Sequence, residues 1–217
     1  MISSRLAIPF AGSKSKSAMR KAITHLKKAD PVLAALIDRI GPFRMEYGPP
    51  EFHSLAESIV YQQLNGKAAA TIFERLAARA GQPLTPQGIL RLSEGEMRSV
   101  GLSKQKSSYL RDMAARTLKG EVDFGKLCDL SDEDVIEHLT RVKGVGVWTA
   151  QMFLMFTLRR PNVFPTGDFG VRAAIKKHYR KRQLPTPAQM EKIARSWEPY
   201  RTAACWYLWK SMDVKTL

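Results

Sequence analysis

Helix start signals recur along the chain, and no stretch alternates apolar and polar residues as a β-strand does. Asp30-Pro31 shows the signal most fully, because Asp caps the first amides, Pro fits the first helical position, and Gly41 follows as a stop. Four more starts carry a Ser or Thr cap, often with a Pro, Glu or Asp behind it: Thr85, Ser93, Ser131 and Thr186. Short connections separate the segments, so we predict a compact all-α fold.

The charge balance points to a polyanionic partner. Lys and Arg number 35 against 20 Asp and Glu, which gives a net charge of +15. Nucleic acid is the first candidate and an anionic membrane the second. The apolar run 6–11 is interrupted by Pro9 and is too short for a membrane span or a secretory signal. Residues 1–18 are expected to form a flexible basic tail.

Only two cysteines occur, Cys128 and Cys205. They cannot make a disulfide framework, a zinc ribbon or a four-thiolate cluster. We therefore expect a reduced, cytoplasmic protein without a structural metal cage.

A glycine-rich hairpin is the most informative segment. One helix is expected to end near Arg141 and a second to begin near Val147, with Gly144 and Gly146 in the turn and Lys143 beside it. Glycines permit positive φ and a close approach to another surface. Amides of such a turn and of the following helix N-terminus suit a phosphate. An ordinary helical hairpin is the alternative, which the basic context disfavours.

A carboxylate follows the second helix of the hairpin. Pro165 and Gly167 interrupt the helical pattern, and Asp168 stands where a new helix begins. Asp168 could serve only as an N-cap.

Together, the hairpin, the Pro/Gly loop and the aspartate resemble the signature of the helix-hairpin-helix superfamily of DNA glycosylases. The resemblance implies that turn amides hold a DNA phosphate. It implies either no cofactor or a structural Na⁺ or K⁺ bound by the turn carbonyls. It also implies that Asp168 is catalytic. A carboxylate stabilises the positive charge that develops on deoxyribose as the base leaves, and it can orient the attacking water.

The branch within that superfamily is indicated by Trp148. Strand-cleaving members carry a nucleophilic Lys at this position, whereas Lys143 lies on the other side of the turn. The four closely spaced cysteines of the iron–sulfur branch are missing, since only Cys205 lies in the C-terminal part. A monofunctional glycosylase that uses water is expected.

Three blocks are similar to the alkylation-repair branch, 3-methyladenine DNA glycosylase II. They are I-V-Y-Q-Q-L-N-G-K-A-A at 59–69, G-L-S-x-x-K-x-x-Y-L at 101–110, and W-E-P-Y-R-T-A-A-C-W-Y-L-W at 197–209. The resemblance covers about residues 30–212. It departs from the family at Asn65, where Ser is usual, and at Met152, where an aromatic is common.

The fold implied is two helical subdomains with the active-site cleft between them. Residues 19–54 and 166–217 would form one subdomain, and 55–165 the central bundle with the hairpin at about 135–158. Electron-poor alkylated purines attract aromatic faces. Base-pocket candidates are therefore Trp148, Phe169, Tyr200 and Trp206, with a place in the core as the alternative for each.

A flipped base leaves a gap in the duplex that a side chain usually fills. Gln63 and Leu64 are the wedge candidates, and the run of six basic residues from Arg172 to Arg182 favours DNA as well. The expected DNA contacts, wedge included, are Gln63, Leu64, Asn65, Lys67, Ser103, Lys104, Lys106, Lys143, Gly144, Val145, Gly146, Thr149 and Arg172.

The function expected is hydrolytic removal of bases such as 3-methyladenine and 7-methylguanine from double-stranded DNA. The abasic product would pass to other repair enzymes, and a cytoplasmic monomer is expected, associated with the nucleoid if the source is bacterial. Two alternatives stay open: a non-catalytic DNA-binding protein with this hairpin, and a glycosylase for mismatched or oxidised bases.

Overall fold

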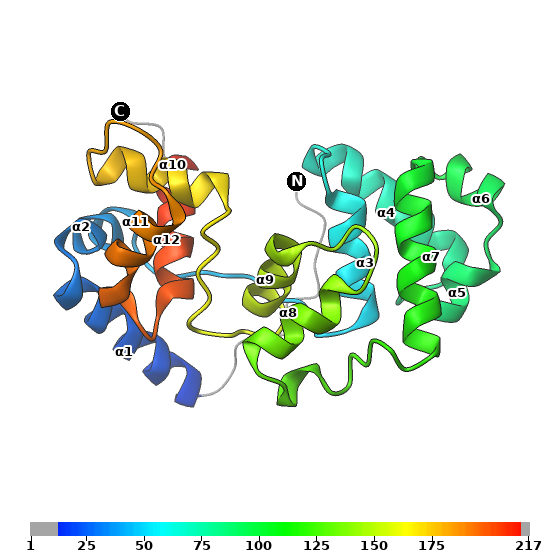
Figure 1. Cartoon of the computed structure of the whole chain (residues 1–217), viewed down its shortest axis with the longest axis horizontal. Helices are drawn as coiled ribbons and strands as arrows, with labels where there is room; N and C mark the ends of the chain where they lie inside the picture. The colour runs from blue at the N-terminus through cyan, green and yellow to red at the C-terminus, as the bar shows by residue number, and fades with distance from the viewer. Residues whose placement is uncertain (1–12, 214–217) are drawn as a thin grey trace. The chain divides into compact units, whose positions relative to one another are not determined.

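The fold is all-α, as predicted. A computed structural model describes residues 13–213, which contain twelve α-helices, two 3₁₀ helices and no strand (Figure 1). In chain order they are α1 Ser13–Ala29, α2 Pro31–Ile40, α3 Phe52–Tyr61, α4 Gly66–Ala80, α5 Pro86–Arg91, α6 Glu94–Ser99, α7 Lys104–Leu118, η1 Leu127–Asp129, α8 Asp132–Thr140, α9 Val147–Phe156, α10 Phe169–His178, α11 Pro187–Ala194, η2 Arg195–Trp197 and α12 Arg201–Asp213. None of these helices is long and apolar enough to cross a membrane.

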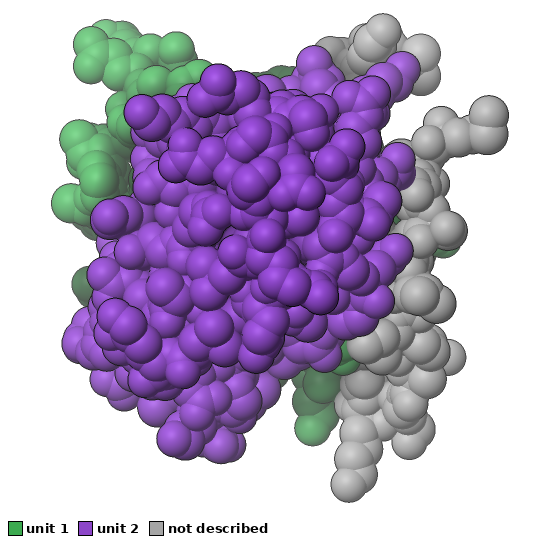
Figure 2. Space-filling view, turned by 90° about the vertical axis from the view of Figure 1, so that its right-hand side faces the viewer, with its two compact units in different colours: residues 1–47, 159–217 green, residues 48–158 purple. Residues whose placement is uncertain are grey.

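Two compact units make up the chain, and Figure 2 colours them separately. The first combines residues up to Tyr47 with those from Arg159 onward, and it contains α1, α2 and α10 to α12. The second, Gly48–Leu158, contains α3 to α9. The chain therefore leaves the first unit after α2 and returns to it before α10.

Side-chain caps start most of the helices. All five predicted starts are confirmed, because Asp30, Thr85, Ser93, Ser131 and Thr186 each accept a hydrogen bond from an amide of the helix that follows. Asn65, Ser103 and Asp168 cap α4, α7 and α10 in the same way. Each bond satisfies one of the amides that a helix N-terminus leaves without a partner.

In the first unit, α12 packs against α10 and α2. Its residues Ala204, Cys205 and Leu208 are fully buried. Beside this core, Asp30 is 6% exposed and joins three elements. It caps α2 with one carboxylate oxygen and accepts Tyr179 Oη at 2.7 Å and Trp197 Nε1 at 2.8 Å with the other.

The second unit is built around α7, which packs against α3, α5 and α6. Leu110 and Met113 of α7 are fully buried. The helices α8 and α9 lie side by side (Figure 1) and form the predicted hairpin. Phe153 and Leu154 are its buried residues near the end of α9.

Both unit boundaries come earlier than the 54/55 and 165/166 that we predicted. Gly48 N donates to Phe156 O at 2.9 Å, which joins the segment before α3 to the second unit. The loop after α9 belongs to the first unit because Thr202 N donates to Pro161 O at 3.0 Å. Residues 13–18 of the expected tail belong to α1, which begins at Ser13, and residues 1–12 lie outside the described part.

Asp30→Ala is expected to lower the free energy of unfolding of the first unit by about 3 kcal/mol, because it removes a cap and leaves two buried donors without an acceptor. Urea unfolding followed by tryptophan fluorescence measures this, since three of the four tryptophans lie in that unit. Asp38→Ala is the matched control: Asp38 is exposed and pairs only with Lys27 at 2.6 Å. An equal loss from both substitutions would contradict the prediction.

Candidate active site

Only one of the two hairpin glycines is required by the fold. Gly144 has φ +78°, and a Cβ there would lie 2.1 Å from the Tyr109 ring. Gly146 has φ −93° and nothing within 4 Å of an added Cβ. A side chain would therefore fit at Gly146, and the predicted approach of DNA at this glycine stays a prediction.

Two of the turn amides that were expected to bind a phosphate are hydrogen-bonded within the protein. Lys143 N donates to Asp112 Oδ2 at 2.9 Å, and Val145 N donates to Val142 O at 3.1 Å. Val145 is also 4% exposed, so neither its amide nor its side chain serves DNA as predicted. No side chain caps α9, which follows Gly146, and the N-terminus of a helix attracts anions.

The end of α3 is fixed to the hairpin by Gln62, whose Nε2 donates to Gly144 O at 2.9 Å. Lys106 Nζ in turn donates to Val60 O at 2.6 Å and Gln62 O at 2.7 Å. These carbonyls lie at the negative end of α3, which attracts a cation. The prediction that Lys106 contacts DNA phosphate is therefore corrected: its ammonium group supports the α3 terminus, and partial burial lowers its pKa.

The wedge candidates lie on the turn that follows. Gln63 is exposed and has φ +56°, an uncommon conformation for a residue with a side chain. Leu64 is exposed to 39%, which is unusual for a leucine beside a core. Asn65, which stands where the family usually has Ser, caps α4, because its Oδ1 accepts from Ala68 N at 2.9 Å. Lys67 is exposed in the first turn of α4.

An open pocket of about 850 Å³ lies between this turn and the hairpin. Trp148, 46% exposed, lines it together with Met152 and Tyr61. The other residues that line the pocket are Ser58, Gln62, Gln63, Leu64, Ile72, Gly101, Ser103, Gln105, Lys106, Tyr109, Gly144 and Thr149. An exposed indole in a pocket of mixed polarity offers a stacking face to a planar ring.

Asp168 lies in the first unit and is 8% exposed. Its Oδ1 accepts Val171 N at 2.7 Å as the cap of α10, and also accepts Trp209 Nε1 at 2.8 Å from α12. Two donors on one oxygen fix the orientation of the carboxylate. Burial, reinforced by this carboxylate, raises the pKa of the neighbouring Cys205 thiol, so the thiol stays protonated.

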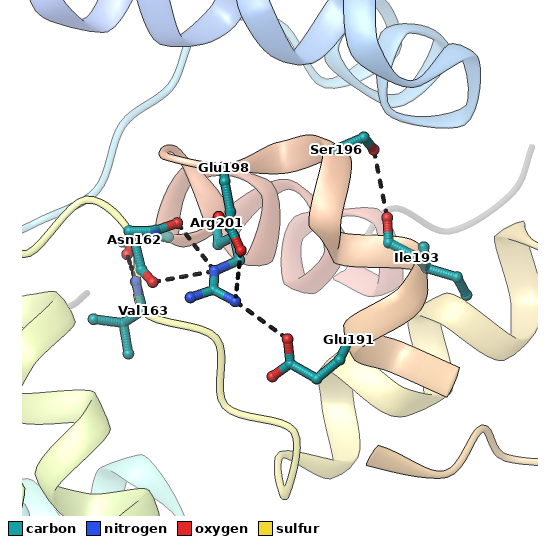
Figure 3. Close-up of polar contacts among 8 residues, drawn as sticks. Asn162, Val163, Glu191, Ile193, Ser196, Glu198 and Arg201 are labelled. Carbon is teal, nitrogen blue, oxygen red and sulfur yellow. Dashed lines mark hydrogen bonds and ion pairs between the residues drawn. The ribbon is translucent and has the colours of Figure 1, made fainter. Parts of the chain in front are cut away.

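The loop that carries Asp168 is anchored to α12 (Figure 3). The Arg201 guanidinium donates through Nε to Asn162 Oδ1 at 3.0 Å, and its Nη1 pairs with Glu191 at 3.2 Å and Glu198 at 3.4 Å. Thr202 Oγ1 donates to Arg160 O at 2.7 Å and accepts from Val163 N at 3.0 Å. These contacts position the irregular segment before α10.

The aromatic pocket candidates have different environments. Phe169 follows Asp168 and is 69% exposed, and Tyr200 is half-buried with its ring edge against His25. Trp206 is 7% exposed and packs on Phe43 and Tyr207, which corrects its assignment to the pocket in favour of the core. Trp148 belongs to the other unit.

The remaining expected DNA contacts divide by exposure. Lys104 and Lys143 are exposed and free to meet a phosphate. Ser103 caps α7, Thr149 is 6% exposed, and Arg172 Nε donates to Pro185 O at 3.2 Å. Ser103, Thr149 and Arg172 therefore hold the local structure.

Sequence reasoning missed two residues of these sites. Trp209 is the last residue of the 197–209 block, and its position in the sequence did not show that its indole donates to Asp168. Gln62 is the first Gln of the Q-Q-L block and contacts the hairpin. Both contacts join segments far apart in the chain, and only their place in family blocks could have suggested them.

Comparison with known proteins agrees with this geometry. Residues 56–199 match the sequence model of the HhH-GPD superfamily of base excision DNA repair proteins. The chain belongs to this superfamily. It is 35% identical to DNA-3-methyladenine glycosylase 1 of Schizosaccharomyces pombe over 205 residues, which cover 91% of this chain and 90% of the relative.

Two solved structures are also similar. The S. pombe 3-methyladenine DNA glycosylase in complex with abasic DNA gives a TM-score of 0.80 at 33% identity, covering 89% of this chain and 97% of that one. The DNA-3-methyladenine glycosidase of Bacillus halodurans gives 0.80 at 35% identity, with 88% of each chain covered. The protein is an enzyme of the DNA glycosylase type.

Gly144→Ala is expected to destabilise the second unit by about 2 to 4 kcal/mol, because a side chain at positive φ would also collide with the Tyr109 ring. Gly146→Ala, with ordinary φ and open space, should leave stability unchanged. Urea unfolding followed by circular dichroism compares the two variants. Equal stability of both would show that the hairpin tolerates a side chain at either position.

Proposed function

We propose that this protein excises alkylated bases of the 3-methyladenine and 7-methylguanine type from double-stranded DNA by hydrolysis, leaving an abasic site. The likeness to the S. pombe relative carries this proposal, since it extends over nine-tenths of both chains. The chain's net charge of +15 fits a DNA substrate. Action on duplex DNA as a monomer, followed by other enzymes that process the abasic site, completes the proposal.

Asp168 is the proposed catalytic carboxylate. Loss of the base develops positive charge on deoxyribose, and a fixed carboxylate in a site of low dielectric constant stabilises that charge more than water does. The hydrogen bonds from Trp209 and the Val171 amide support this role, because an already oriented carboxylate needs no rearrangement as charge develops. The same group would orient the attacking water.

The hairpin is the proposed anchor on one DNA strand. Its support is the uncapped N-terminus of α9 with open space at Gly146 and exposed Lys143 beside it. A monovalent cation at the turn is part of the proposal, since the carbonyl oxygens of Val142 and Gly144 each accept a hydrogen bond and carry a second lone pair. Na⁺ or K⁺ there would add positive charge near the strand.

Gln63 and Leu64 are the proposed wedge. Filling the gap left by an extracted base requires side chains on a firm support. The bonds from Lys106 to the end of α3 and from Gln62 to the hairpin provide it. Trp148 offers an indole face that attracts a cationic base by about 0.5–2 kcal/mol.

Asp168→Asn is expected to abolish release of 3-methyladenine from methylated duplex DNA while DNA affinity stays within about twofold, because the carboxylate acts on charge that is present only in the transition state. Chromatography of released bases and fluorescence anisotropy measure the two quantities. Asp38→Asn, which changes an exposed carboxylate of the same unit outside this site, is the matched control. Excision by the Asn variant at the parent rate would remove Asp168 from the mechanism. DNA binding without release by either protein would favour a non-catalytic DNA-binding protein.

Base loss without strand cleavage is expected at neutral pH. Trp148 occupies the position at which strand-cleaving relatives would carry a Lys nucleophile, and the Lys106 amine is held by two carbonyls. Borohydride treatment during turnover should therefore trap no protein–DNA adduct. A trapped adduct, mapped by peptide mass spectrometry, would reveal an amine nucleophile and overturn the monofunctional assignment.

A further inference from the structure

A second cavity, of about 450 Å³, lies on another side of α7. Six α7 residues at helical spacing line it, and Leu90 of α5, Glu94 and Arg98 of α6, Leu102, and Lys143 of the hairpin complete it. The α7 residues are Lys104, Ser107, Ser108, Arg111, Asp112 and Ala115. The cavity shares none of its lining with the pocket beside Trp148.

The lining is basic. Arg98, Lys104, Arg111 and Lys143 supply four cationic side chains against the carboxylates of Glu94 and Asp112. Asp112 is already engaged, since its Oδ2 accepts from Lys143 N at 2.9 Å and from Arg116 Nε at 3.0 Å. Burial works to raise the pKa of Asp112, but these hydrogen bonds outweigh it, and the pKa is lowered. A ligand in the cavity therefore meets a positive potential.

The guanidinium group of Arg111 has one donor without a hydrogen-bond partner in the described part of the chain. Its Nη2 donates to Leu92 O, but its Nε is buried and has no hydrogen-bond acceptor in the described part of the chain. A buried guanidinium N–H without an acceptor is costly. Guanidinium groups pair with phosphate oxygens in forked geometry, so a phosphate is the ligand class that fits the charge and the arginines of this lining.

We propose that this cavity binds a phosphodiester group of the DNA strand held by the hairpin. Lys143 links the two places, because it lies in the hairpin turn and also lines the cavity. A strand at the N-terminus of α9 therefore passes within reach of Arg98 and Lys104, which are exposed. The inference rests on the proposed function for its DNA source and extends the contact surface along the strand beyond the hairpin.

The test is the salt dependence of binding to an undamaged duplex by wild type and the Arg98→Gln, Lys104→Gln double variant. Each lost phosphate contact reduces the slope of log K against log salt by about 1 and weakens binding near 0.1 M salt by about tenfold. Between about 50 and 200 mM salt, the slope for the double variant should be smaller than that of wild type by at least about 1. Both residues are exposed, so their replacement should leave the fold intact.

The control double variant, Arg79→Gln with Lys119→Gln, removes the same charge from exposed positions of the second unit outside the cavity. It should retain the wild-type slope. Equal changes in both double variants would mean that only net charge matters, and an unchanged slope in the Arg98 and Lys104 variant would mean that no strand contact exists. Either result overturns the proposal.

Nuclear magnetic resonance separates the two sources of phosphate. The Arg111 Nε–H signal, assigned by its loss in Arg111→Lys, should shift with duplex DNA and not with inorganic phosphate at equal ionic strength. A shift with inorganic phosphate alone would make this a site for a free anion, and no shift with either would overturn the site. Base release by wild type is measured in parallel: its absence would count against the proposed function, while the salt slopes would still decide the strand contact.

Discussion

Side-chain capping of helix N-termini is the interaction on which this structure depends. The described α-helices run from 6 to 17 residues, and isolated helices of that length are marginal in water. Most therefore begin with an Asp, Asn, Ser or Thr side chain that accepts an orphaned amide. Asp168 shows how the same interaction serves chemistry, since the bond that starts α10 also holds the carboxylate in place.

The hairpin departs from this pattern, because α9, like α3, begins without a side-chain cap. Gly146 brings no side chain to the start of α9, and in the proposed function this helix N-terminus binds an external anion. The strength of this arrangement comes from neighbours. Gln62 holds the Gly144 carbonyl, and Asp112 holds the Lys143 amide, so the turn is rigid before any ligand arrives. Rigid donors lose little entropy on binding.

Local rules explain how much of this could be predicted from the sequence. Caps, Pro and Gly signals act over four residues or fewer, and all five predicted starts were confirmed, together with the hairpin and the all-α class. The roles of Lys106 and Trp206 were wrong because they are decided by partners far away in the chain. The Trp209–Asp168 bond was missed for the same reason. A lysine near a DNA-binding motif has the same sequence appearance whether its ammonium group meets a phosphate or a helix carbonyl.

The two units carry different parts of the proposed activity. The contacts described above that orient Asp168 come from the first unit: the Val171 amide, Trp209, and the Arg201 and Thr202 bonds that anchor its loop. The hairpin, the wedge turn and both cavities lie in the second unit. Substitutions in the second unit should therefore act first on DNA affinity and its salt dependence, and those around Asp168 on the rate of the chemical step. A variant such as Trp209→Phe, which keeps the carboxylate and removes one donor, belongs to the second class because it changes the orientation of Asp168.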